Sequence, residues 1–375
     1  MNKKMQMFDK DTSLALKGFA IQLMLFHHCF RKTRLFEGYD ISFLPLSQEM
    51  AVNIAFSFKI CVSIFAFISG YGLFQSYQTY KIQQRYTETD NTAARWIFAR
   101  YIRSFSPYWF IWILWATISQ LVDNRIERTF LLQNVQRGLL YAAIDFLGLS
   151  KLFGSPTLND DWWYMSAAAV FILIIPLVFF LKEELYVAIA VAVVLPRVIF
   201  AGTQNGAFPG WSSVYSFISP FLTGCLFAKE NLFNKPFLTS RDGVKRALWF
   251  LGELLLVLFG YKAFYRIPIE EFWEIHYCIF PLSVILFCVD FVVQFPYIRR
   301  LLKFLGKHST NIYLTHGFIR SYYFTDFIYS FKSCWIIVLV LLGCSLIISI
   351  IFEGLKKICL YNAFFSHQCK RLLHG

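Results

Sequence analysis

Acidic residues are scarce in this chain. Only 23 of the 375 residues are Asp or Glu, and all charged residues together make up 16%, whereas an average soluble domain carries about 25%. Hydrophobic residues make up 57%, and the mean hydropathy is +0.51. This shortage of charge excludes an ordinary soluble protein and predicts a polytopic membrane protein.

The motifs of common soluble enzymes are also missing. The sequence has no Gly-x-Ser-x-Gly elbow, no Walker loop and no dinucleotide fingerprint. Its nine cysteines lie mostly within apolar stretches and lack the spacing of a metal site. We therefore expect neither a bound metal nor a disulfide framework.

Basic residues outnumber acidic ones, which gives a net charge of +13. In a soluble chain this excess would suggest nucleic acid, but here the cations lie in short loops between apolar segments. Such loops fix the orientation of a protein in its membrane. The sequence therefore predicts contact with membrane lipids and no nucleic-acid partner.

Apolar segments of spanning length follow one another along the chain. Because every backbone group in lipid must find its partner internally, we expect helices, and hence an all-α, polytopic membrane helix bundle with about ten transmembrane helices. The expected spans are 13–30, 51–77, 97–121, 162–181, 184–202, 211–228, 247–265, 275–294, 310–329 and 333–353.

The loops alternate in their content of Lys and Arg. One set, which includes both ends of the chain, carries twice as many as the other, so the positive-inside rule places both termini in the cytoplasm. We expect a membrane domain over 1–355 and a basic cytoplasmic tail over 356–375 that lies along the inner surface. The longest external loop, 122–161, is too apolar for disorder and predicts a re-entrant or interfacial helix.

The segment LALKGFAIQLMLFHHCF, residues 14–30, places a cation and two imidazoles inside one apolar stretch. Lys17 and His28 are eleven positions apart, which puts them on one face of a helix, about 16 Å apart along its axis. Ionisable residues inside a membrane are usually functional. The alternatives are that Lys17 extends to the headgroups and that His28 is an ordinary buried histidine.

Arg100 and Arg103, in ARYIRSFSPYWF, share one face at the predicted cytoplasmic end of their span. Two arginines so placed suit a phosphate or pyrophosphate, although they could equally anchor the span. In LGKHSTNIYLTHGF, we expect His316 inside a span and His308 solvated in the preceding loop.

Other polar or small residues give weaker signals. Ser69, Gly70 and Gly72 favour close helix packing over a functional role. Each of a second set could be a buried functional residue or simply a helix-end residue that reaches an interface: Lys59, Glu253, His276 and Asp290. Three external aromatic residues could stack on sugar rings or anchor the chain at the interface: Trp162, Trp163 and Trp211.

Six of these stretches, in this order, resemble acyltransferase family 3, bacterial membrane proteins that O-acylate, most often O-acetylate, sugars of the cell envelope. The stretches are LKGFAIQLMLFHH, FAFISGYGLF, RYIRSFSPYW, DWWYMSAAAVFILIIP, FLTGCLFAKE and LGKHSTNIYLTHGF. The first is similar to the family's opening signature, a Lys or Arg eleven positions before a His. The chain departs from some branches at 167–169, where three alanines stand in place of a glutamate.

The resemblance implies a membrane O-acetyltransferase of the bacterial cytoplasmic membrane. Its donor would be cytoplasmic acetyl-CoA, and its acceptor a cell-envelope sugar or polysaccharide, or a lipid-linked precursor. His28 would act as general base or become acylated itself. We assign catalysis to His28, Lys17 and His27, the CoA phosphates to Arg100 and Arg103, and the acceptor to Trp163, Tyr313 and His316.

Two other functions fit part of the pattern. A transporter or exporter of a polysaccharide or small solute would use His28 in a proton relay, but the chain shows no inverted repeat. A scaffold without catalytic function would have lost motif residues, yet Lys17, His28, Arg100 and Arg103 are all present. The acyl group, the acceptor and the oligomeric state stay open at this stage.

Overall fold

The computed structural model describes residues 8–87, 93–132, 135–181, 184–189, 191, 214–234, 243–267 and 275–374. Its regular elements are all helical over this part of the chain, apart from an isolated bridge between Ser42 and Ser333. This confirms the predicted all-α class.

Helices form over the apolar runs, and two of them begin at a capping side chain, Asp9 before α1 and Ser47 before α2. Asp9 accepts a hydrogen bond from the backbone N–H of Thr12 and so caps the first helix. The α-helices are α1 (Lys10–Phe30), α2 (Gln48–Ser57), α3 (Ile60–Thr87), α4 (Ala93–Asp123), α5 (Val135–Phe146), α6 (Ser150–Phe153), α7 (Tyr164–Phe180), α10 (Ile218–Lys229), α12 (Val244–Arg266), α13 (Phe280–Asp290), α14 (Pro296–Gly317), α15 (Thr325–Tyr329), α16 (Cys334–Ile358) and α17 (Tyr361–His374).

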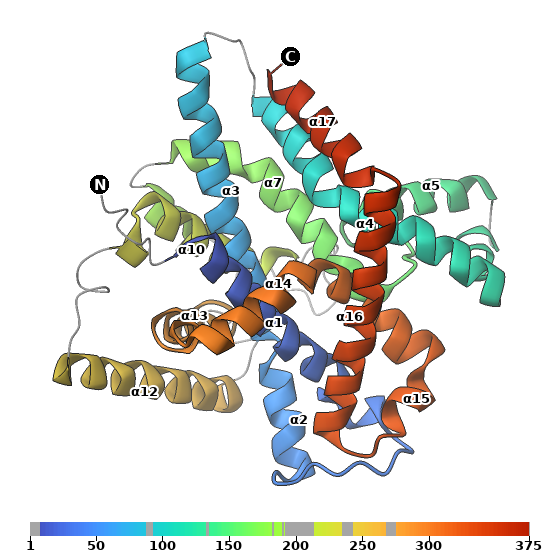
Figure 1. Cartoon of the computed structure of the whole chain (residues 1–375), viewed down its shortest axis with the longest axis horizontal. Coiled ribbons are helices and arrows are strands. Elements are labelled where there is room, and N and C mark those ends of the chain that lie inside the picture. The colour runs from blue at the N-terminus through green and yellow to red at the C-terminus, as the bar shows by residue number, and fades with distance from the viewer. Residues whose placement is uncertain are drawn as a thin grey trace.

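Short 3₁₀ and π turns link these helices. They are η1 (Thr33–Leu35), η2 (Glu127–Leu131), η3 (Asp160–Trp163), η4 (Leu232–Asn234), η5 (Ile275–Ile279), η6 (Val292–Gln294) and η7 (Phe318–Tyr323). Figure 1 shows α1 and α14 crossing near the middle of the molecule, with α3, α7 and α4 on one side. This central crossing positions Lys17 and His28 of α1 relative to His316 of α14.

Five helical runs among the described residues are long and apolar enough to cross a membrane. They are Gln48–Gln84, Asp160–Phe180, Val244–Arg266, His276–Gln294 and Cys334–Ile358. Helices also cover the predicted spans 13–30 and 97–121. Most of the span 184–202 lies outside the described residues, as does Trp211. The number of ten spans and the cytoplasmic position of the termini stay predictions.

The helix that carries His316 differs from the prediction. The expected span 310–329 is divided, because α14 begins at Pro296 and ends at Gly317, and η7 and α15 follow. The prediction of a solvated loop at His308 was wrong, since His308 lies in α14, half-buried, with its Nδ1 2.9 Å from Ser349 Oγ. Polar residues of α14 thus pair with polar residues of α16. From hydropathy alone, this polar part of α14 is predicted to be a loop.

Glycines allow α1 and α14 to touch backbone to backbone. A Cβ added to Gly18 would lie 1.8 Å from the carbonyl oxygen of Leu302, and one added to Gly306 would lie 1.8 Å from that of Leu14. Larger side chains at either glycine would force the helices apart, as in other small-residue crossings. This crossing fixes how the Lys17 and His28 helix meets the His316 helix.

A second crossing of this kind joins α3 and α10. A Cβ on Gly70 would lie 2.0 Å from the carbonyl oxygen of Phe221, and one on Gly224 would lie 2.1 Å from that of Phe67. The packing interpretation therefore fits Gly70. Gly72 has open space beside it and lines a cavity instead.

The predicted external loop and tail both fold into helices. Residues 122–161 contain η2, α5, α6 and η3, and α5 exposes Leu139 and Leu140 while it buries Gly138 and Asp145. In the tail, α17 runs beside α4 (Figure 1). Tyr361 donates a hydrogen bond to the carbonyl oxygen of Ser106 there.

Candidate active site

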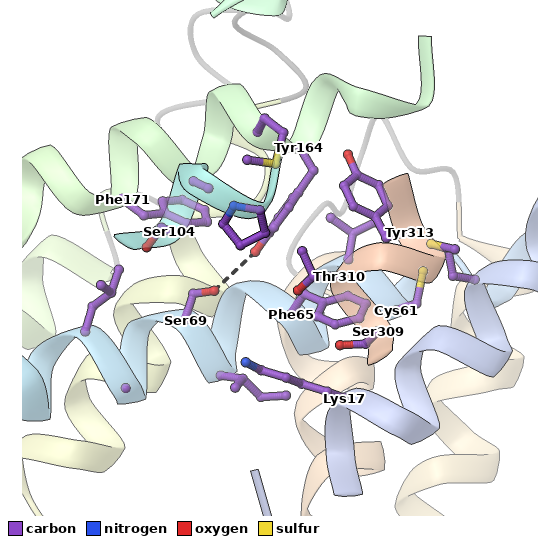
Figure 2. A pocket seen from close by; sticks show the side chains of 18 of the residues that line it. Lys17, Cys61, Phe65, Ser69, Ser104, Tyr164, Phe171, Ser309, Thr310 and Tyr313 are labelled. Carbon is purple, nitrogen blue, oxygen red and sulfur yellow. Dashed lines mark hydrogen bonds between the residues drawn. The ribbon is translucent and has the colours of Figure 1, made fainter. Parts of the chain in front are cut away.

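A cavity of about 390 Å³ lies between α1, α3, α4, α7 and α14. Figure 2 shows Lys17, Ser69 and Tyr164 entering it from three different helices. The Ser69 and Tyr164 hydroxyls lie 3.5 Å apart, and aromatic and aliphatic side chains form much of the remaining wall. This space, called the first cavity below, thus combines an apolar wall with a few polar groups.

Three cations line the first cavity. They are Lys17 from α1 and Arg100 and Arg103 from α4. Within the described part of the chain none of the three forms a salt bridge with a carboxylate, and Arg100 Nε is buried without a hydrogen-bond partner. Uncompensated positive charge in a partly buried space favours an anionic ligand.

His28 lines the same cavity and is buried. Its Nδ1 is 3.3 Å from Asp161 Oδ1, although the alignment is not that of a hydrogen bond. Catalytic hydrogen bonds are often loose before substrate binds and tighten afterwards. The arrangement is that of an imidazole oriented by a carboxylate.

Asp161 has two further partners. The imidazole of His316 approaches within 3.4 Å, measured from its Nε2 to Asp161 Oδ2, and Arg320 Nη2 lies 3.7 Å from the same oxygen. The rings of His28 and His316 are 4.8 Å apart. One carboxylate therefore links two histidines and one arginine, which compensates its charge in a buried site.

The backbone around Asp161 is tightly held. Its N–H donates to Asn159 Oδ1 at 2.9 Å, and its carbonyl oxygen accepts from the Tyr313 hydroxyl at 2.6 Å. Trp162, next in sequence, donates from Nε1 to the carbonyl oxygen of Leu314 at 2.9 Å. The 122–161 segment is thus fastened to α14, and Asp161 is fixed opposite His28.

A glycine makes room for this carboxylate. A Cβ added to Gly317 would lie 2.6 Å from Asp161 Oδ2 and 2.8 Å from Asn159 Nδ2. Because both neighbours are short, well-held side chains, an added methyl group would displace the carboxylate. Gly317 is therefore needed here for close approach rather than for backbone flexibility.

A second cavity, of about 360 Å³, borders the first and shares part of its lining. His28, Asp161 and Trp163 line both cavities. His27 lines the second cavity but not the first. Its Nδ1 is 2.8 Å from the carbonyl oxygen of Ala55 in α2. Cys61 and Val62 line both cavities as well, so the His28–Asp161 pair forms part of a wall that the two spaces share.

His28, Asp161 and His316 also form the kind of cluster that holds metal ions, with ligand atoms within 4.8 Å of one another. Arg320, however, already compensates the shared carboxylate. A divalent cation at this point would lie beside the guanidinium, and the two positive charges would repel each other. The donor set therefore fits proton transfer better than metal binding.

The sequence matches a known protein family over most of its length. Residues 14–354, nearly the whole chain, match the model of acyltransferase family 3, described as an acyltransferase domain. The chain belongs to this family. Together with its long apolar helices, this makes the protein a membrane acyltransferase. Comparisons of the acyltransferase with curated proteins and with solved structures found no match.

Most residues selected from the sequence lie around the two cavities of the acyltransferase. Those that line the first are Lys17, His28, Ser69, Gly72, Arg100, Arg103, Trp163 and Tyr313, and those that line only the second are His27 and Lys59. His316 contacts Asp161 behind the wall, and Trp162 is buried. The sequence reasoning missed Asp161 and Arg320, although an acid directly before a tryptophan-led apolar span, in a chain so poor in acids, was a usable signal for Asp161.

Proposed function

We propose that the protein is an O-acetyltransferase that uses acetyl-CoA to acylate a hydroxyl group of a cell-envelope sugar or polysaccharide. One observation supports this most: Lys17, Arg100, Arg103 and His28 line the same cavity. The three cations match the phosphates of an acyl-CoA, and the imidazole lies where its thioester would arrive. The bacterial cytoplasmic membrane is the location that fits this donor and acceptor.

The donor would enter beside α4. Its phosphates would bind Arg100 and Arg103, because guanidinium groups bind phosphate in a bidentate manner. The pantetheine arm would then follow the apolar wall past Lys17. Since Lys17 and His28 are about 16 Å apart along α1, a long, thin arm is the form of ligand that reaches from one to the other.

His28 would act as general base. Its imidazole accepts the proton of the acceptor hydroxyl while that oxygen attacks the thioester carbonyl carbon. The new C–O bond forms as the C–S bond breaks, and the imidazolium then protonates the departing CoA thiolate. Proton transfer of this kind typically contributes about 10²–10⁴-fold to a rate.

Asp161 would position His28 and stabilise it while it carries the extra proton. His316 and Arg320 would in turn keep that carboxylate in place and compensate its charge in the resting enzyme. In this scheme Tyr313 supports the backbone of Asp161 rather than the sugar. Trp163, which lines both cavities, is the aromatic residue best placed to contact donor and acceptor together.

Binding of acetyl-CoA to the purified chain in detergent tests this proposal. Replacing Arg100 and Arg103 together by Gln should weaken binding at least tenfold. The matched control, Lys245→Gln with Arg246→Gln, removes the same charge from an exposed site at the start of α12 and should bind normally. If no acyl-CoA binds the unmodified chain, the transporter reading replaces this one.

A further inference from the structure

The second cavity is also positively charged. Arg31, Lys59 and Lys151 line it, from the end of α1, the break between α2 and α3, and α6. Among the described residues none of them forms a salt bridge, and Arg31 Nε is buried without a hydrogen-bond partner. Lys59 donates to a neutral group, the Tyr277 hydroxyl, at 3.0 Å.

The acidic residues of this cavity do not balance that charge. Asp160 is exposed at its rim, and Asp161 is shared with His28, His316 and Arg320. Membrane orientation does not account for the three cations either. Two of them lie in loops predicted to be external, where the positive-inside rule expects few, and they line a cavity instead of facing lipid.

We propose that the second cavity binds the acceptor, and that this acceptor carries a carboxylate or phosphate group near the hydroxyl that is acylated. This inference rests on the proposed function and specifies its substrate class. An anion held by Arg31 and Lys59 lies next to the His28–Asp161 pair, because the same cavity contains all four residues. The acceptor hydroxyl and the donor thioester then meet at His28, which lines both cavities.

Two matched sugars test the charge requirement. Binding of methyl glucuronide and of methyl glucoside, which differ in a carboxylate, is measured on the purified chain in detergent by the change in tryptophan fluorescence. Glucose 1-phosphate serves as the phosphate probe. We expect at least one of the two anionic sugars to bind tenfold or more tightly than methyl glucoside.

Variants locate the effect. Replacing Arg31 and Lys59 together by Gln should remove the preference for the anionic sugar, while acetyl-CoA binding at the first cavity stays unchanged. The control replaces Lys32 and Arg34, which are exposed beside Arg31 and do not line the cavity. It removes the same charge and should keep the preference.

The outcomes separate this inference from the proposed function. Equal affinity for charged and uncharged sugars, or no binding of either anionic sugar to the unmodified chain, overturns the anionic acceptor while acetyl-CoA binding still supports the acyltransferase mechanism. A preference that survives in the Arg31 and Lys59 variant moves the anion site elsewhere and also overturns the assignment. If the unmodified chain does not bind acetyl-CoA, the proposed function itself is refuted.

Discussion

Replacing Asp161 by Asn removes one charge from the centre of the site and leaves its shape almost unchanged. The carboxylate lies 3.3 Å from His28 Nδ1, and two unit charges at that distance attract by about 5 kcal/mol at an effective dielectric constant of 20. Each 1.36 kcal/mol corresponds to about a tenfold change in rate. If the full attraction acted in the transition state, the rate would fall by between three and four orders of magnitude.

The measured effect should be somewhat smaller, because the amide retains a dipole and Arg320 is released from the carboxylate. We expect a loss of about 10³-fold in kcat for release of CoA from acetyl-CoA, with water or an added sugar as acceptor of the acetyl group, a range typical of general base catalysis. Affinity for acetyl-CoA should stay the same, since the proposed phosphate ligands, Arg100 and Arg103, belong to α4 and form no salt bridge with Asp161. Asp40→Asn, an exposed change in the loop after α1, provides the control. A folded Asp161→Asn protein that keeps more than a tenth of the activity would refute this reasoning.

Three further predictions follow from local geometry. Gly317→Ala should reduce CoA release at least tenfold, because its methyl group would occupy the position of the Asp161 carboxylate; Gly343→Ala, where nothing lies within 4 Å of the added carbon, should not. Prolonged treatment with EDTA should leave CoA release unchanged, and an activity restored only by added metal would instead favour the histidine–carboxylate metal site. Burial raises the pKa of Asp9, but its hydrogen bonds and the Arg299 guanidinium lower it by more, so that its pKa lies below the ordinary value. The ionised Asp9 carboxylate therefore contributes fully to stability above the ordinary pKa of about 4, and this contribution is lost as the pH falls through the lower folded-state pKa. Asp9→Asn should lower the melting temperature at pH 7. The difference in melting temperature between the variant and the unmodified protein should shrink towards pH 3.

The part of the site that lies within single helices could be predicted from the sequence. Helical periodicity alone places Lys17 and His28 on one face, and the same rule pairs Arg100 with Arg103. The structure brings these four residues to one cavity. The sequence of neither segment indicates that the two segments lie side by side. The resemblance to a family was needed to connect them.

The carboxylate partner could not be derived in this way. Asp161 reaches His28 because the 122–161 segment is fastened to α14 by Trp162 and Tyr313, and that is a tertiary contact between distant parts of the chain. Arg320, from η7, approaches the other carboxylate oxygen, Oδ2, which His316 also approaches. Hydropathy treats such residues only as interruptions of an apolar run.

Hydropathy misplaced boundaries for a related reason. His308 lies in a polar stretch, for which a hydropathy profile predicts exposure to solvent. In the structure, however, α16 packs against the polar face of α14. Asn311 of α14 bonds to Glu353 and Lys356 of α16 across the same interface, and those two residues bond to each other within α16. Polar residues that satisfy each other inside a bundle are therefore indistinguishable, in sequence, from a loop.

Replacing His28 by Ala and measuring release of CoA from acetyl-CoA by the purified chain, with water or an added sugar as acceptor of the acetyl group, tests directly whether His28 is the base. We expect release to be abolished while acetyl-CoA binding and the melting temperature are retained, and we expect His367→Ala, an exposed change in α17, to release CoA normally. Full activity in a folded His28→Ala protein would contradict the account and would transfer the role of base to His27 or His316.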